Sequence, residues 1–273
     1  MDLESGICSI ALDKNGKANK NNICDYCYAA RIFSKDPDAF RIKEIKELEF
    51  KKIADKYPAH ILRLGKFFEV GSKRTRSQLY QVLELCVKYK MRPIVTTKLL
   101  EMDRKVSDLV KKSQGIVHIS LGDDSQEKGA IKQGSTNRWR LAQAIKYKRA
   151  HCPVAVRIVY DVTLPMSDFY KKVFSHMGSS GILLTPLRYT SKKCLEDNRT
   201  DITWEEATST GLFTFLHGSL QPNALHDDWK PCREICGQVG SRFHCNNCVG
   251  KINFNKKDYK KQLITLGWNE AAE

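Results

Sequence analysis

The stretch SQLYQVLELCVKYKMRPIVTTK, residues 77–98, combines a helical pattern with a strand pattern that follows it directly. In its first part, apolar side chains recur at the spacing of one helical face, namely Leu79, Val82, Leu83 and Cys86. Its second part, residues 92–98, is a short run rich in β-branched residues. The stretch therefore predicts a helix over 77–90 and a strand over 92–98.

The same alternation extends along most of the chain. Runs typical of strands occupy residues 60–70, 92–98, 115–122, 153–162, 181–187 and 211–218, and 6–12 would supply a seventh. A second helical segment covers 137–150, with Leu141, Ala144 and Ile145 on one face. Strands that alternate with helices predict right-handed crossovers and a parallel sheet, hence an α/β fold. Periodicity does not decide between an open sheet and a barrel, but six or seven strands are fewer than the eight of a full barrel.

The last part of the chain departs from this rhythm. Residues 219–273 are rich in Cys, Asn, Gly and Lys, with one helical pattern at 256–267. We expect a main domain over residues 1–218 and a small Cys-rich, metal-binding appendage over 219–273.

Composition describes an ordinary globular protein of 273 residues, with 41% hydrophobic and 28% charged residues. Neither a membrane-spanning run nor a signal-peptide pattern is present, so we expect a cytoplasmic protein with no membrane partner. The net charge of +15 favours a nucleic acid or nucleotide partner. Because the basic residues are scattered in short groups, a solvated basic surface is the alternative.

Clustered thiols in a reducing compartment favour metal binding. Near the C-terminus, four thiols fall within 17 residues: Cys232, Cys236, Cys245 and Cys248. Four thiolates at such spacings can hold either a tetrahedral zinc ion or a [4Fe–4S] cluster, and the spacing does not decide between them.

A second group of thiols lies near the N-terminus and has three members, Cys8, Cys24 and Cys27. Structural zinc would need a fourth ligand, and the first histidine in the chain is His60. Three thiolates suit a cluster in which one iron stays open to an exogenous ligand.

The sequence Cys24-Asp25-Tyr26-Cys27 resembles the C-x-aromatic-C end of the signature of radical S-adenosylmethionine (SAM) enzymes. Its continuation, Tyr28-Ala29-Ala30, is similar to a branch that includes phage-encoded members and relatives of spore photoproduct lyase. The resemblance implies a partial (β/α)6 barrel and a [4Fe–4S] cluster on the three cysteines, with SAM on the fourth iron. The fifteen residues between Cys8 and Cys24 depart from the usual three and read as an inserted polar loop, which closure entropy tolerates.

The same resemblance implies a set of SAM-binding positions, most of them at successive strand ends: Tyr26, Gly65, Glu69, Lys98, Ser120, Arg138 and Arg157. For the polar ones, an ordinary hydrogen bond at a loop or strand end is the alternative. The sequence identifies no catalytic residue, and Cys194 and Tyr160 are the candidates.

The implied activity is reductive cleavage of SAM to a 5′-deoxyadenosyl radical, which abstracts hydrogen from a substrate. The electron donor would be of the flavodoxin or ferredoxin type, and the C-terminal cysteines would hold a second [4Fe–4S] cluster or, alternatively, zinc. A nucleic-acid base or nucleotide, modified or repaired, is the expected substrate, and Trp139, Tyr160 and Tyr189 could stack on a base. Two alternatives are a peptide-modifying radical SAM enzyme and a non-catalytic, zinc-dependent nucleic-acid-binding protein.

Overall fold

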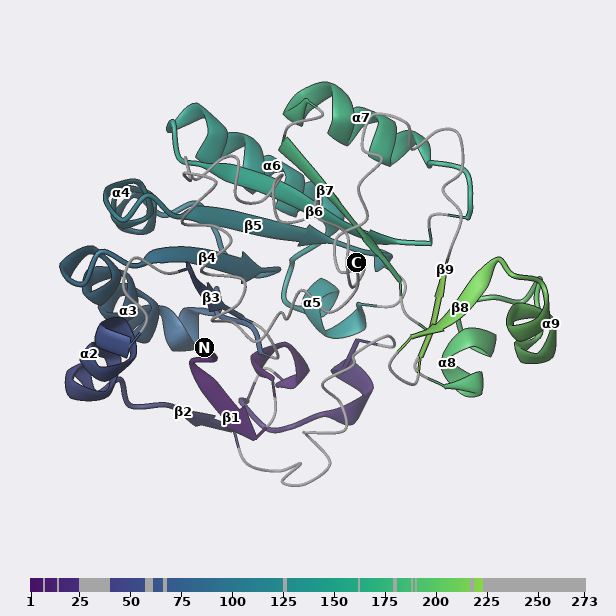
Figure 1. Ribbon diagram of the computed structural model, residues 1–273, viewed down its shortest axis with the longest axis horizontal. Coiled ribbons are helices and arrows are strands. Elements are labelled where there is room, and N and C mark those ends of the chain that lie inside the picture. The colour runs from purple at the N-terminus through teal and green to yellow at the C-terminus, as the bar shows by residue number, and fades with distance from the viewer. Residues whose placement is uncertain are drawn as a thin grey trace.

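A curved sheet of five parallel strands forms the centre of the protein, seen in a computed structural model (Figure 1). The structure describes residues 1–6, 8–13, 15–24, 40–56, 61–65, 68–124, 127–161, 163–178, 181–187, 189, 191–216 and 219–222. The sheet contains β3 (Ile61–Leu64), β4 (Arg92–Thr97), β5 (Ile116–Leu121), β6 (Val154–Tyr160) and β7 (Ile182–Pro186), in that order. The predicted α/β fold with a parallel sheet is confirmed.

Helices connect these strands. Between successive strands lie α3 (Arg76–Lys88), α4 (Arg104–Lys112), α5 (Lys128–Lys132), α6 (Asn137–Arg149) and α7 (Asp168–Met177), with a short 3-10 turn, η3 (Lys73–Thr75), before α3. The turns η1 (Ser9–Ala11) and η2 (Lys20–Asn22) and the helix α2 (Glu47–Lys56) precede β3. The helices predicted over 77–90 and 137–150 are confirmed as α3 and α6. Side-chain caps fix where helices begin: Asp103 accepts from the Val106 N–H at 3.0 Å at the start of α4, and Thr136 accepts from the Trp139 N–H at 3.2 Å at the start of α6.

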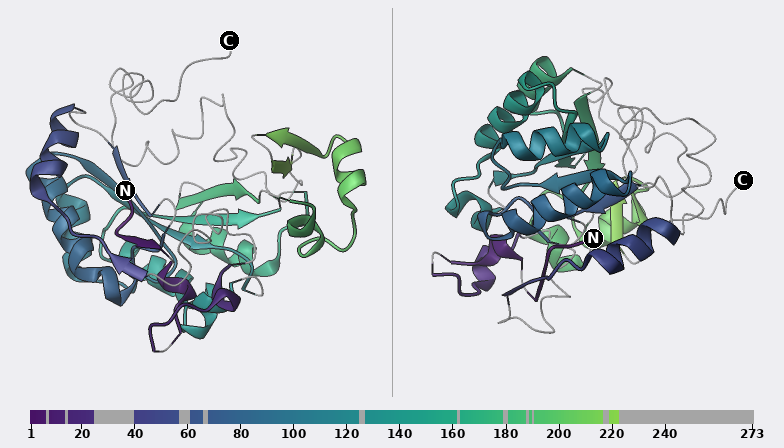
Figure 2. Two further views of the ribbon diagram at one scale, coloured as in Figure 1. Left: turned by 90° about the horizontal axis from the view of Figure 1, so that it is seen from below. Right: turned by 90° about the vertical axis from the view of Figure 1, so that its left-hand side faces the viewer.

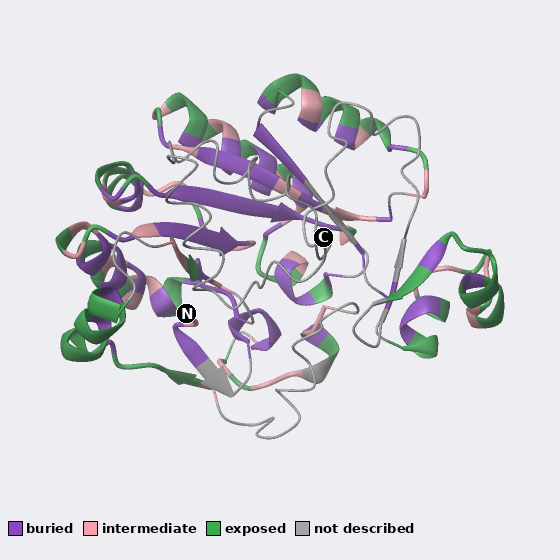
Figure 3. Cartoon of the chain, in the orientation of Figure 1, coloured by how far each residue is buried: buried purple, intermediate pink, exposed green. Residues whose placement is uncertain are grey.

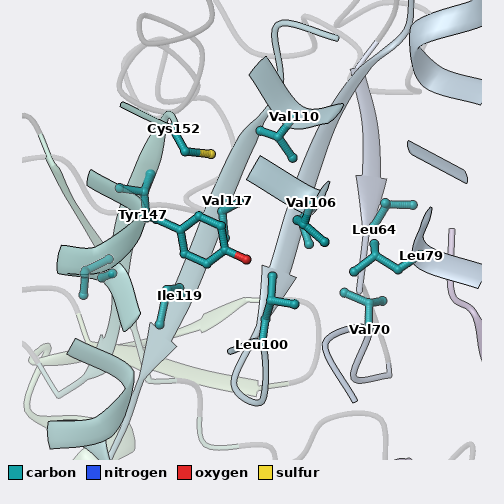
Figure 4. Packing of buried hydrophobic residues seen from close by; sticks show 14 of the residues in the cluster. Leu64, Val70, Leu79, Leu100, Val106, Val110, Val117, Ile119, Tyr147 and Cys152 are labelled. Carbon is teal, nitrogen blue, oxygen red and sulfur yellow. The ribbon is translucent and has the colours of Figure 1, made fainter. Parts of the chain in front are cut away.

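The helices cover one face of the sheet, which we call the outer face (Figures 1 and 2). Because the strand order follows the chain order, right-handed crossovers place α3, α4, α6 and α7 on the same side, whereas the short helix α5 packs against η1 and η2. Alternate strand residues such as Val95, Val117 and Val156 pack there against the buried stripes of the helices. Figure 4 shows this packing between β5 and α4, where Val106 and Val110 lie near Val117. The strands are buried along most of their length, whereas the helices expose their outer sides (Figure 3).

A smaller unit follows the sheet. It contains α8 (Lys192–Glu196), α9 (Trp204–Ser209) and the antiparallel hairpin of β8 (Phe213–Leu216) and β9 (Ser219–Pro222). Tyr189 links it to the sheet, exchanging two backbone hydrogen bonds with Leu220 at 2.9 and 2.8 Å. The predicted domain boundary after residue 218 stays a prediction, and β8 and β9 pair across it.

Two segments that we predicted to join the parallel sheet do not belong to it. Residues 211–218 contain a strand, β8, but among the described strands it pairs with β9 and not with the parallel sheet, because Phe213 packs in a separate cluster with Tyr189 and Leu195. Within 6–12 the structure has the turn η1, and β1 (Glu4–Gly6) pairs antiparallel with β2 (Phe40–Ile42). Apolar alternation identifies a strand but not its partner.

Several predictions fall on residues outside the described ranges. They are Tyr26, Cys27, the four C-terminal cysteines Cys232, Cys236, Cys245 and Cys248, and the helix over 256–267. The appendage therefore stays a prediction. Among the described helices, none has the length and apolar character needed to cross a bilayer.

Candidate functional site

The face of the sheet opposite the helices, here called the inner face, changes from apolar to polar along the strands. Near the strand beginnings it carries Ile94, Ile116, Ala155 and Leu183. Two or four residues further on, the alternation of side chains puts Thr96, His118, Ser120 and Arg157 on the same face. Ser120 and Arg157, both predicted to contact SAM, are register partners on β5 and β6. The polar end is the carboxyl-terminal end, where parallel α/β sheets bind ligands.

Gly65 and Glu69 organise the loop that leads from β3 toward α3. Gly65 has a φ of +78°, and a Cβ there would lie 2.4 Å from the carbonyl oxygen of Thr96, so only glycine fits. The Glu69 side chain is buried and accepts from the Gly71 N–H at 2.6 Å, from the Thr97 hydroxyl, and from the Lys98 N–H at 2.8 Å. Both residues therefore shape the carboxyl-terminal edge between β3 and β4.

Cys8 lies against this loop. The Glu69 N–H donates to Cys8 Sγ at 3.4 Å, and the thiol is almost fully buried. Burial, with the nearby Glu4 carboxyl, raises the pKa of Cys8 well above its ordinary value. Glu4 is itself buried and accepts from the Ser9 N–H at 2.9 Å, and burial raises the pKa of Glu4 to about 8. In the metal-free protein both groups are held largely in their uncharged forms at neutral pH.

Cys24 joins the same apolar cluster as Cys8, which also includes Ile10, Ala11, Leu12 and Phe68. Lys98, the residue after β4, places its Nζ 3.5 Å from Cys24 Sγ and 2.7 Å from Glu127 Oε1. Burial raises the pKa of Cys24, and the Lys98 ammonium opposes that shift. The structure thus gathers two of the three predicted N-terminal ligands with two of the predicted cofactor contacts, Glu69 and Lys98.

Glu127 and Arg140 form a buried ion pair behind Lys98. Both side chains are fully buried, and Arg140 Nη1 contacts Glu127 Oε2. Arg140 also donates to Ser135 Oγ at 2.9 Å, to the Ser135 carbonyl at 2.7 Å and to the Ser120 carbonyl at 3.3 Å. Burial raises the pKa of Glu127, while Arg140 opposes the rise. The pair fastens the ends of β4 and β5 to the start of α6.

Neither member of this pair was predicted. The arginine of α6 that we predicted as a SAM contact is Arg138, which lies exposed in the first turn of the helix. Helical phase could have found Arg140, because it stands four residues before Ala144 and seven before Tyr147, both buried on one face. Glu127 lies in a polar segment with no comparable signal.

The long loop between Cys8 and Cys24 is braced by α5. Gln133 Nε2 donates to the carbonyls of Ser9 and Ile10 at 3.0 and 3.1 Å, and Lys132 Nζ donates to Asn22 Oδ1 at 2.9 Å. A Cβ at Gly129 would lie 2.2 Å from the Asn22 carbonyl oxygen, so the loop packs directly on the helix backbone. An open pocket of about 440 Å³ lies where the loop meets this helix, and Lys132, Gln133 and Arg74 line it together with loop residues.

The two candidate catalytic residues lie apart from the cysteines. Cys194, in α8, is buried in the cluster around Tyr189. Tyr160, at the end of β6, is half-buried, stacks edge-on against Tyr170 with ring centroids 5.0 Å apart, and donates to the Pro165 carbonyl at 3.3 Å. Burial raises the pKa of Tyr160. A catalytic role for either residue stays a prediction.

Within the part of the chain that the structure describes, no group of three or more Cys, His, Asp or Glu side chains could hold a metal ion. The third predicted N-terminal ligand, Cys27, lies outside those residues. The roles of Cys8 and Cys24 as ligands and of Gly65, Glu69, Lys98, Ser120, Arg138 and Arg157 as SAM contacts therefore stay predictions.

Comparison with solved structures found several of spore photoproduct lyase. A cysteine-to-serine variant of that lyase has a TM-score of 0.50 and 14% identity, covering 92% of this chain and 72% of the lyase chain. A doubly substituted variant of the lyase with bound AdoMet and dinucleoside spore photoproduct has a TM-score of 0.47 and 15% identity, covering 84% of this chain and 69% of the lyase chain. A complex of the lyase with dinucleoside spore photoproduct has a TM-score of 0.48 and 15% identity over 75% of this chain, which spans 65% of that lyase chain.

Comparisons with models of protein families and with curated proteins found no match. At these identities the similarity to the lyase is a similarity of fold.

Proposed function

We propose that this chain is a radical SAM enzyme that uses a [4Fe–4S] cluster on Cys8, Cys24 and Cys27. The observation that carries the proposal is the meeting of Cys8 and Cys24 in one apolar cluster beside Lys98, although fifteen residues separate them. Their place at the carboxyl-terminal edge of a parallel sheet is where α/β proteins bind ligands. A partial barrel, extending the five parallel strands, belongs to the same proposal.

The donor set fits a cluster rather than a disulfide or a simple core. Soft thiolates are the ligands that iron–sulfur clusters take, and binding the metal deprotonates them. Two features of the site stabilise charged sulfur: the Glu69 N–H donates to Cys8 Sγ, and the Lys98 ammonium faces Cys24 Sγ. Hydrogen bonds to ligand sulfurs tune the reduction potential of such clusters.

When bound and reduced, the cluster and SAM supply a 5′-deoxyadenosyl radical for hydrogen abstraction. The chain's own residues orient and enclose the reactants. Glu69 and Gly65 fix the edge that carries Lys98, and Ser120 with Arg157 presents polar groups on the inner face. Apolar residues at the strand beginnings close the other end of this face to water.

For the substrate, we propose a nucleic-acid base or nucleotide. The support is the net charge of +15, which attracts a polyanion and predicts binding that weakens with salt. The peptide-modifying alternative predicts no such salt dependence. An electron donor of the flavodoxin or ferredoxin type and a cytoplasmic location complete this proposal.

We further propose that Cys232, Cys236, Cys245 and Cys248 hold a second [4Fe–4S] cluster in the 219–273 appendage, with zinc as the alternative. The metal content of a Cys232→Ala/Cys236→Ala variant decides between iron and zinc at this position.

The deciding experiment is anaerobic purification, followed by assay of iron, sulfide and zinc and of 5′-deoxyadenosine released on reduction with SAM. Wild type should hold about 7 to 8 irons per chain if both sites carry four-iron clusters. A Cys24→Ala/Cys27→Ala variant should lose one cluster and all SAM cleavage. The matched control, Cys86→Ala, removes a thiol that is buried in the hydrophobic core of α3 and should retain both. Zinc at both sites without SAM cleavage would refute the proposal.

A further inference from the structure

We propose that Glu127, anchored by Arg140, is a positioning residue that holds the Lys98 ammonium against Cys24 and so sets the affinity of the site for SAM. The inference rests on the proposed roles of Cys24 as a cluster ligand and of Lys98 as a SAM contact. It assigns a function to a buried ion pair that neither the sequence pattern nor the fold comparison identifies.

Two hydrogen bonds hold the backbone of Lys98, whereas its side chain could adopt several rotamers. Its N–H donates to Glu69 Oε2 at 2.8 Å, and its carbonyl accepts from the Ser135 hydroxyl. The long side chain beyond has about 2 kcal/mol of rotamer entropy to lose when it is ordered. The contact with Glu127 Oε1 at 2.7 Å orders it, and the Nζ then lies 3.5 Å from Cys24 Sγ.

The two carboxylate oxygens of Glu127 contact different cations. Oε1 faces Lys98, and Oε2 faces Arg140. Arg140 cannot move with the carboxylate, because its other donors bond the Ser135 side chain and the carbonyls of Ser135 and Ser120. Glu127 therefore fixes the position of Lys98 relative to the end of β5 and the start of α6.

The charges of Glu127, Arg140 and Lys98 give an electrostatic reason for this position of Lys98. Glu127 and Arg140 compensate each other's charge at full burial, and Lys98, with 15% of its side chain exposed, adds one positive charge on the side of Cys24. Without the carboxylate, two cations would share a poorly hydrated space, which is costly. Lys98 has a path to water and Arg140 has none, so Lys98 would leave Cys24.

The test is a double-mutant cycle on the anaerobically assembled protein, using Glu127→Gln, Lys98→Met and the double variant. The readouts are iron per chain, the dissociation constant for SAM from its effect on the spectrum of the oxidised cluster, which does not cleave SAM, and that spectrum without SAM. Glu127→Gln should weaken SAM binding by about 10- to 100-fold, as loss of an outer-shell partner does. In the Lys98→Met background it should add little, because its effect passes through Lys98.

Two further variants separate positioning from folding. Glu127→Met combined with Arg140→Met replaces the pair by apolar side chains, which often leaves stability intact, and it should still weaken SAM binding like Glu127→Gln. Glu84→Gln removes the carboxylate of an exposed ion pair with Lys105, in which the charged atoms lie 2.8 Å apart. It should change neither the iron content nor the dissociation constant for SAM. If Glu127→Gln does not fold, the apolar pair replacement supplies the measurement in its place.

The outcomes distinguish this inference from the function it rests on. Wild type that assembles no N-terminal cluster would overturn both. A wild-type cluster that binds SAM, with unchanged affinity in Glu127→Gln or with additive losses in the double variant, would overturn only the role of Glu127.

Discussion

Replacing Gly65 by alanine should destabilise the protein through backbone strain and close contacts with neighbouring carbonyl oxygens. The residue has a φ of +78°, and the added Cβ would lie 2.4 Å from the Thr96 carbonyl oxygen and 3.3 Å from that of Phe68. Left-handed backbone alone costs an L-residue about 1–2 kcal/mol. Forcing an atom into occupied space costs about 1–3 kcal/mol more, since both obstructing atoms are backbone. We expect Gly65→Ala to lower the free energy of unfolding by about 2–5 kcal/mol.

Gly134 provides a matched control for the backbone contribution. Its φ is +79°, and a Cβ there would meet nothing within 4 Å. Gly134→Ala should therefore cost only about 1–2 kcal/mol, and the difference between the two variants in urea unfolding isolates the contact with Thr96. Equal losses in the two variants would show that the approach of the Gly65 loop to β4 is not tight, and the account of how Lys98 is placed would fall with it.

Three other perturbations have defined outcomes. Burial alone would raise the pKa of Asp103, but hydrogen bonds from Tyr80, the Val106 N–H and Arg76 hold it below its ordinary value, so this carboxylate stabilises the fold above about pH 4 and ceases to as pH falls through the lowered pKa. Asp103→Asn should therefore cost about 1–3 kcal/mol in urea unfolding at pH 7, and the difference from wild type should shrink as pH falls through the lowered pKa of Asp103. Leu79→Ala should cost about 2–5 kcal/mol at any pH, because it opens a cavity in a fully buried cluster. Gly129→Ala should reduce the iron retained per chain without altering the circular dichroism spectrum, because its Cβ would push the loop off α5; unchanged iron content would contradict the bracing role.

Local patterns predicted the elements of this fold better than their pairing. The stripe from Leu79 to Cys86 and the run over 92–98 became α3 and β4, since helical phase and β-branched content are written within a few residues. Residues 211–218 contain a strand as predicted, but it does not join the parallel sheet. Which strand pairs with which depends on clusters assembled from distant segments.

In the candidate site, too, some residues could be predicted from the sequence and others could not. Lys98 could be anticipated, because it ends a predicted strand at a position where the family resemblance implies a contact with SAM. Glu127 could not, because a buried carboxylate is tolerated only where partners compensate its charge. Those partners, Lys98 and Arg140, stand 29 residues before it and 13 residues after it. Polar residues that can be buried only because they compensate one another's charge form no periodic pattern in the sequence.

The proposed cluster site has fifteen residues between Cys8 and Cys24, where the signature that the sequence resembles has three. Lengthening a three-residue loop to fifteen costs only about 1.4 kcal/mol in closure entropy. The hydrogen bonds from Gln133 to the Ser9 and Ile10 carbonyls, at about 1 kcal/mol each, offset that cost, and burial of Ile10 adds to them. Gln133 directly follows α5, and Glu127 directly precedes it. One short helix thus fixes both the loop that delivers Cys24 and the carboxylate that directs Lys98 toward it, so the longer spacing and the buried ion pair are parts of a single arrangement.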